Sequence, residues 1–286
     1  MTHRLAIVTL LSFFLAACGD SSTTGADRCA GKSMEAGTRE VFIESGGRTR
    51  RFLLSVPPSA LTGRPAELVL GYHGVASTPE AFLTVTAFEE KAAEQGFIVA
   101  AGAGVDRSWN AGACCDPAMS LEIDDVGFTR DMITAIEDEV CIDSGRIFAT
   151  GFSNGGAMTF RLACQAADLF VATSPVAGGI ASSCEPAHDD SILIVQNVDD
   201  PFVPFVLGEV AADQFAGLNA CGPERVTTEP ASNTVCDAAP SCGSGTTVEL
   251  CAVSGISHQW PGGATDPTGP YRATDAMWDF FSAAGS

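Results

Sequence analysis

The hydrophobic residues of the chain follow two alternating patterns, short continuous runs and longer stretches with helical spacing. The continuous runs predict buried strands at residues 68–72, 97–101, 147–150, 170–174, 192–196 and 248–253. The helical spacing predicts helices at residues 79–96, 123–140, 154–167, 210–220 and 272–280. Strands that are apolar throughout are typical of parallel sheets with helices on both faces, so the alternation predicts an α/β fold with a mostly parallel central sheet.

Two further segments stand outside this alternation. Residues 39–44 and 50–56 flank a Gly-Gly pair at 46–47 and predict a hairpin. Residues 221–251 carry four Cys, are rich in Pro, Ser, Thr and Gly, and lack helical periodicity, which predicts a disulfide-pinned excursion before the last strand. A chain of 286 residues, 46% of them hydrophobic, suits a single globular domain over residues 37–286.

The N-terminus has the pattern of an export signal. Arg4 precedes an apolar run of 13 residues from Leu5 to Ala17, which is too short to span a membrane comfortably. The run ends in Leu-Ala-Ala-Cys, which resembles the lipobox of bacterial lipoproteins. We therefore expect a signal peptide at 1–17, a lipid anchor on Cys18 and a polar tether over 18–36. The protein would be held at the periplasmic or outer face of a bacterial membrane; an ordinary secretory peptide would instead leave it secreted.

The charge of the chain disfavours nucleic acid as a partner, and its cysteines predict disulfides. The 15 Lys and Arg residues against 35 Asp and Glu residues give a formal net charge of −20, which repels the phosphates of a nucleic acid. Of the 11 Cys, ten remain when Cys18 is set aside, and this even number predicts up to five disulfides in an exported chain. The sequence has no C-x-x-C unit of the kind zinc sites use, so we expect neither a metal nor another cofactor.

The strongest chemical signal is Gly151-Phe152-Ser153-Asn154-Gly155, placed between a predicted strand and a predicted helix. G-x-S-x-G in this context is a nucleophile elbow, in which small residues allow a tight turn that exposes the serine hydroxyl. Ser153 is the predicted nucleophile. The Asn154 N–H, at the start of the helix, is a predicted donor to the oxyanion.

A serine nucleophile needs a base and an acid, which follow it in this order of elements. His258 follows the last strand and is the predicted base, whereas His188 lies in a polar loop. Asp199 and Asp200 both follow the strand at 192–196, and we favour Asp200 because Pro201 rigidifies its turn.

The loop after the first central strand supplies the second predicted oxyanion donor. Gly74 permits a close approach of the backbone there, and the Val75 N–H is the expected donor. His73 precedes the nucleophile and is interpreted as a structural residue of this loop. Trp109 and Trp260 lie in loops near the same edge of the sheet, where they would either wall a substrate pocket or pack in the core.

Several motifs occur in a fixed order along the chain: Tyr72-His73-Gly74, Ser108 to Gly112 with Cys114-Cys115, Asp124 to Phe128, Gly151 to Met158, Asp200 to Pro204, and His258 to Gly262. Their order resembles that of the extracellular polyhydroxybutyrate depolymerase and feruloyl esterase group of α/β-hydrolases, many of which bacteria export. The resemblance implies an α/β-hydrolase fold with Ser153, Asp200 and His258 as the catalytic triad. The chain departs from it at 196–201, where Gln-Asn-Val-Asp-Asp-Pro replaces a common His-Gly-Thr-Ala-Asp-Pro.

The pairing of the cysteines is open from sequence alone. The family often has Cys at the positions of Cys164 and Cys184, which we expect to pair, and the four Cys of 221–251 are expected to pair locally. For the adjacent Cys114 and Cys115, disulfide geometry favours separate partners.

The resulting prediction is a serine esterase, acting on polyhydroxybutyrate oligomers or similar short polyesters. The alternative is a feruloyl or acetyl esterase acting on plant polysaccharide esters. The chain ends after the last predicted helix, so we expect no separate polymer-binding module, which favours soluble oligomers and small esters over crystalline polyester. A serine peptidase and a lipid-anchored binding protein without catalysis are less favoured, since all three triad residue types are present in order.

Overall fold

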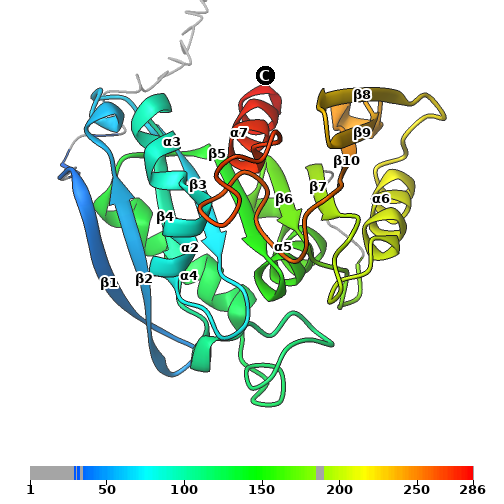
Figure 1. Ribbon diagram of the computed structural model, residues 1–286. Helices are drawn as coiled ribbons and strands as arrows, with labels where there is room; N and C mark the ends of the chain where they lie inside the picture. The colour runs from blue at the N-terminus through cyan, green and yellow to red at the C-terminus, as the bar shows by residue number, and fades with distance from the viewer. Residues whose placement is uncertain (1–28, 30, 33–34, 185–189, 286) are drawn as a thin grey trace, which may run out of the picture.

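The computed structural model describes residues 29, 31–32, 35–184 and 190–285. The predicted signal peptide, Cys18, most of the predicted tether and His188 lie outside the described residues. Within the described part, ten strands form one sheet in the order β1-β2-β4-β3-β5-β6-β7-β10-β9-β8 (Figure 1). None of the helices in this part is long and apolar enough to cross a membrane.

Six parallel strands form the centre of the sheet, and each lies where a continuous apolar run predicted a strand. Every neighbouring pair among them is parallel, so their carboxyl ends meet at one edge. They are β3 (Ala66–Tyr72), β4 (Ile98–Gly102), β5 (Ile142–Phe152), β6 (Ala172–Val176), β7 (Ser191–Asn197) and β10 (Val248–Val253). The loops that follow β3, β5, β7 and β10 are therefore brought together, as is typical of sites in α/β proteins.

Antiparallel strands extend this sheet at both edges. The predicted hairpin is confirmed as β1 (Gly37–Ser45) and β2 (Arg48–Val56), which pairs with β4. The segment 221–251, expected as a disulfide-pinned excursion, carries two disulfides and also a second hairpin, in which β8 (Val226–Ala231) and β9 (Thr234–Ala239) pair beside β10. Five of the six residues of β8 are exposed, so this edge strand lacks the apolar pattern that marks a buried one.

Helices cover both faces of the sheet (Figure 1). Leu68, Leu70 and Tyr72 of β3 point into the core under α4 (Asp125–Glu139) and α5 (Asn154–Gln165), and Val69 points into the opposite core. That second core lies under α2 (Pro79–Thr86), α3 (Phe88–Gln95) and α7 (Ala273–Ala283). The remaining helix, α6 (Val206–Leu218), packs beside α5 against β7 and β10.

The single helix predicted over 79–96 is two helices. Ala87 takes a left-handed conformation with φ 57°, which ends α2 and starts α3 at Phe88. The bend keeps Phe82 and Phe88 in the same core, with their rings stacked at a centroid separation of 6.2 Å. Gly96 ends α3 with φ 85°, as expected of a C-terminal glycine.

All ten cysteines outside the N-terminal segment are paired. The expected Cys164–Cys184 disulfide and the local pairing of the last four are confirmed, the latter as Cys221–Cys242 and Cys236–Cys251. Cys29 pairs with Cys141. Separate partners for Cys114 and Cys115 are wrong: the two form a disulfide with each other, since every other described cysteine is engaged elsewhere.

Candidate active site

Ser153 lies on a tight turn between the end of β5 and the start of α5. Its backbone has φ 57° and ψ −117°, a conformation that is strained for a residue with a side chain. The neighbouring glycines make the turn possible. A Cβ on Gly151 would collide with the carbonyl oxygen of Gly155, and a Cβ on Gly155 with that of Tyr72. The strand-turn-helix geometry is that of the elbow expected from the G-x-S-x-G motif.

His258 and Asp200 meet at the same edge of the sheet. His258 Nδ1 lies 2.6 Å from Asp200 Oδ2, and the Asp200 side chain is fully buried. The other carboxylate oxygen, Oδ1, accepts hydrogen bonds from the N–H groups of Phe202 (2.8 Å) and Val203 (2.9 Å). The carboxylate is thus fixed from both sides, which places the imidazole proton on Nδ1 and leaves Nε2 for a second partner.

Asp199 has a different contact from its neighbour. Its Oδ2 accepts a hydrogen bond of 2.8 Å from the Gly255 N–H, in the loop that leads to His258. Of the two acids that the sequence left to be separated, Asp200 contacts the imidazole, while Asp199 ties down the loop that carries it.

A cavity of about 420 Å³ opens beside Ser153 and His258. Its large apolar lining residues belong to the core under α2, α3 and α7, and a few hydroxyl and amide groups line the rest. The lining residues are His73, Gly74, Val75, Ser77, Ala81, Phe82, Val85, Thr86, Phe152, Ser153, His258, Gln259, Trp260 and Thr265. An apolar hollow with a few convergent polar groups is the usual form of a small-molecule site.

Two backbone segments next to Ser153 carry the predicted oxyanion donors. Asn154 is the first residue of α5, and the first N–H groups of a helix have no acceptor within it. The loop after β3 approaches from the other side, since a Cβ on Gly74 would lie 3.4 Å from Ser153 Cβ. Val75 follows in this loop and lines the cavity. The two N–H groups predicted to hold an oxyanion therefore belong to segments that adjoin Ser153.

His73 is buried beneath this loop. Its Nε2 accepts a hydrogen bond of 3.0 Å from the Gly104 N–H, so the proton of the neutral ring is on Nδ1, which lies 2.8 Å from the Gly74 carbonyl oxygen. Burial lowers the pKa of His73 below its usual value, which keeps the ring neutral near pH 7. The ring is thus a donor to the loop, in agreement with the structural role expected for it.

Trp109 is fully buried and does not line the cavity, so of the two positions left open for it, a substrate wall and the core, it occupies the core. Its backbone instead forms a two-way contact with the Asn154 side chain: the Trp109 N–H donates to Oδ1 (2.8 Å), and Nδ2 donates to the Trp109 carbonyl (3.0 Å). Its indole Nε1–H donates to the His73 carbonyl at 2.9 Å. Trp109 therefore connects the residue after the nucleophile with the loop after β3.

Trp260 occupies the other position predicted for a substrate wall. It lines the cavity although its side chain is 1% exposed, and its Nε1–H donates to Thr274 Oγ1 at 3.0 Å. Its ring also meets those of Phe82 and Phe152 edge to face. The residue forms part of the cavity and of the core at once.

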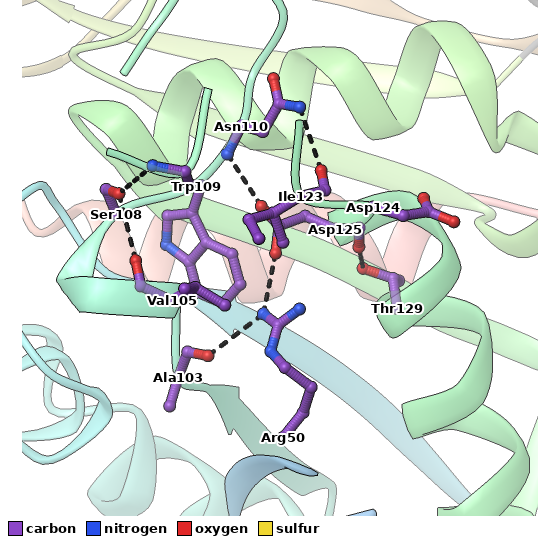
Figure 2. A network of polar contacts seen from close by, with 12 residues as sticks. Arg50, Ala103, Val105, Ser108, Trp109, Asn110, Ile123, Asp124, Asp125 and Thr129 are labelled. Carbon is purple, nitrogen blue, oxygen red and sulfur yellow. Dashed lines mark hydrogen bonds and ion pairs between the residues drawn. The ribbon is translucent and has the colours of Figure 1, made fainter. Parts of the chain in front are cut away.

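A buried ion pair supports the Trp109 segment from below (Figure 2). Arg50 and Asp125 are joined at 2.8 Å, with side-chain exposures of 4% and 0%. The second Asp125 oxygen accepts a hydrogen bond of 2.8 Å from the Asn110 N–H, and Asn110 Nδ2 donates to the Ile123 carbonyl. Burial raises the pKa of Asp125, and Arg50 opposes that rise. The pair therefore holds the backbone at Asn110, directly after Trp109.

The sequence contains a signal for this ion pair in the alternation along β2. Arg50, Phe52 and Leu54 alternate along β2 and all face the core. An arginine at a core-facing position of a strand requires a buried partner. Asp125 is that partner, whereas Asp124 caps α4 by accepting the Gly127 N–H at 2.8 Å.

Among the described residues, one group of possible metal ligands lies close together: Cys236, Glu249 and Cys251. Both of its cysteines are joined in a disulfide, which removes their thiolates as ligands.

Comparison with known proteins finds feruloyl esterases among the relatives of this chain. No family model matches the chain. The chain is 30% identical over 241 residues to a probable feruloyl esterase C of Aspergillus oryzae, covering 82% of this chain and 84% of that protein. It is 31% identical over 227 residues to feruloyl esterase B of Piromyces equi, covering 70% of this chain and 41% of that protein.

A solved structure shares the fold. The acetyl xylan esterase from Aspergillus awamori superposes with a TM-score of 0.68 at 15% identity, over 86% of this chain and 99% of that one. The predicted α/β-hydrolase fold is confirmed by this likeness.

Proposed function

This chain belongs to the feruloyl esterase family of carboxylic ester hydrolases, and we propose that it acts as a serine esterase through Ser153, His258 and Asp200. The observation that carries the proposal is the 2.6 Å contact between His258 Nδ1 and the buried Asp200 carboxylate, with Ser153 and His258 lining one cavity. Ser153 is the nucleophile, His258 the general base, and Asp200 holds the imidazole in the required tautomer.

The proposed reaction is acyl transfer in two halves. His258 takes the Ser153 proton as Oγ attacks the ester carbonyl, and the Asn154 and Val75 N–H groups stabilise the oxyanion. The alcohol leaves with the proton from His258, and the acyl group remains on Ser153 as an ester. Water then attacks this ester with His258 again as base, the carboxylic acid departs, and Ser153 recovers its proton.

For the acyl group we propose a hydroxycinnamoyl or acetyl ester of the kind that decorates plant polysaccharides. Relatives named as feruloyl esterases support this over a polyhydroxybutyrate oligomer, which reverses the order of preference set by the sequence. The cavity is consistent with a planar aromatic acid: Phe82, Phe152 and Trp260 offer flat walls, and Thr86 and Gln259 offer polar groups.

Other features of the chain support an exported enzyme. Five disulfides are typical of proteins that fold in an oxidising compartment. We propose that residues 37–286 form one catalytic domain, with Cys18 as a lipid anchor ahead of it. A serine peptidase is disfavoured by the esterase relatives, and a binding protein without catalysis by the presence of all three triad side chains.

Hydrolysis of nitrophenyl acetate, methyl ferulate and hydroxybutyrate oligomers by wild type and Ser153→Ala tests the proposal. We expect turnover of the first two and a loss of at least about a thousandfold in the variant. Equal activity of the variant would exclude Ser153 as the nucleophile. Faster turnover of the oligomers than of methyl ferulate would restore the polyester interpretation.

A further inference from the structure

Exposed apolar side chains are concentrated next to the cavity. Of the eleven large hydrophobic residues that stand exposed in the described part of the chain, five lie between residues 198 and 210. Single exposed hydrophobic residues are normal on a protein surface, but a cluster of them marks a contact site.

Four of these residues define a strip that we call the α6 patch: Phe202, Val206, Leu207 and Val210, which are 75%, 53%, 42% and 56% exposed. The last three lie on one side of the first turns of α6, because residues three and four positions apart, such as Leu207 and Val210 or Val206 and Val210, share a helix face. Gly208 and Ala211 form the opposite, buried side. The helix lies at the edge of the molecule beside β7 (Figure 1).

The α6 patch continues directly from the catalytic residues. The Phe202 ring lies 5.4 Å from the His258 ring, measured between centroids, and the Phe202 N–H is held by Asp200. His258 in turn lines the cavity, whereas none of the four patch residues does. The patch is therefore an outer surface at the mouth of the cavity and not part of its interior.

The charges around the patch indicate what can cover it. No Lys or Arg occurs between residues 162 and 224, and the charged residues of 198–213 are Asp199, Asp200, Glu209 and Asp213. An anionic membrane surface binds through clusters of basic residues. Beside α6 the structure describes the single Arg225, which lines a hollow together with Glu209 and Asp213. An uncharged apolar surface has no such requirement.

We infer that the α6 patch docks the enzyme onto an uncharged, water-insoluble ester and holds the ester groups at the mouth of the cavity. The inference rests on the proposed function, since it is an ester that must reach Ser153. Contact of the exposed helix face with an extended apolar surface removes both from water, which favours adsorption. The site would then act on esters of an apolar matrix as well as on single molecules in solution.

The test uses neutral polycaprolactone nanoparticles and a double variant, Val206→Gln with Val210→Gln. The matched control is Val226→Gln with Val235→Gln, two exposed valines on β8 and β9. Adsorption is measured in a Ser153→Ala background so that no hydrolysis occurs. We expect the patch variant to adsorb about tenfold more weakly and the control to match the parent, because two apolar side chains lose their buried area. Without Ser153→Ala, the patch variant should keep nitrophenyl acetate turnover within about twofold and lose particle hydrolysis about tenfold.

Three results would overturn the inference. One is adsorption that is unchanged in the patch variant or weakened equally in the control. Another is tighter, patch-dependent binding to phosphatidylcholine vesicles than to the particles, which would assign the face to lipid. The third is a dimer in solution that the patch variant dissociates. Absence of any esterase activity in wild type would instead contradict the proposed function, since adsorption of the Ser153→Ala protein does not depend on catalysis.

Discussion

The Nδ1 atom of His73 lies 2.8 Å from the carbonyl oxygen of Gly74, which belongs to the same peptide group as the Val75 N–H. Donation to that carbonyl fixes the plane of the peptide group and polarises its N–H. The Gly104 N–H holds the other ring nitrogen at 3.0 Å, so the ring cannot turn without losing both bonds. His73 thereby sets the direction of one of the two proposed oxyanion donors without contacting the substrate.

Replacing His73 by Leu should lower kcat with little change in KM. The Val75 N–H would lose its fixed direction, and we expect a fall of about ten- to a hundredfold, somewhat less than the loss of a whole oxyanion donor. Steady-state kinetics on nitrophenyl acetate measure it, with the concentration of active serine titrated by a fluorophosphonate. A normal kcat per titrated site would show that the ring serves packing alone.

His73 should also make the folded state less stable in acid. Its pKa is lowered by burial, so between the lowered pKa and the ordinary value near 6.5 the unfolded chain binds a proton that the folded chain does not. Stability from this group is therefore complete above the ordinary pKa and is lost as the pH falls below it. Between pH 7 and pH 5, the free energy of unfolding measured in urea should fall less for His73→Gln than for wild type. Equal losses would contradict a buried neutral ring.

Trp109→Phe removes one hydrogen bond while keeping an aromatic ring in the core. The His73 carbonyl loses its donor at 2.9 Å, and we expect a cost of about 1 kcal/mol in the free energy of unfolding. Because the indole links the loop after β3 to the segment that holds Asn154, kcat should fall several-fold as well. Urea unfolding and kinetics measured on one preparation separate the two effects. A loss of stability with unchanged kcat would limit Trp109 to packing.

Removing one partner of the Arg50–Asp125 pair should destabilise the fold strongly, whereas replacing both partners by apolar residues should destabilise it little. Asp125→Leu leaves the Arg50 charge buried without its partner, which should destabilise the fold by about 3–5 kcal/mol. Arg50→Met with Asp125→Leu removes both charges and should recover most of that loss. Denaturant unfolding of Arg50→Met, Asp125→Leu and the double variant gives the coupling free energy between the two side chains. Additive effects would mean that the two side chains do not depend on each other.

The sequence predicted the parts of this fold that are decided locally. Continuous apolar runs marked all six central strands, and the G-x-S-x-G spacing marked the turn at Ser153, since only glycine fits beside it. The choice of Asp200 over Asp199 rested on Pro201, and Asp200 is the residue in contact with His258. In each of these cases the sequence signal, an apolar run, a glycine spacing or a proline, lies within a few residues of the feature that it predicts.

What the sequence did not predict depends on partners far along the chain. The exposed strand β8 is formed by pairing with β9 and not by an apolar pattern of its own. Trp109 is drawn into the core by Asn154 and His73, residues 45 and 36 positions away. Such contacts leave no periodic signal, so the sequence left open whether Trp109 lines the cavity or packs in the core, where the structure places it.

Asp200→Asn and Asp199→Asn should separate the two neighbouring acids. Asn at 200 can offer its amide N–H to Nδ1, which favours the wrong imidazole tautomer, and we expect kcat to fall by about a thousandfold or more. Asn at 199 retains an oxygen for the Gly255 N–H, so kcat should change less than about fivefold. Both are measured on nitrophenyl acetate with KM determined alongside. The two substitutions are chemically identical and adjacent. Equal losses of kcat would mean that the two carboxylates share the role of the acid. A greater loss of kcat at Asp199 would assign that role to Asp199.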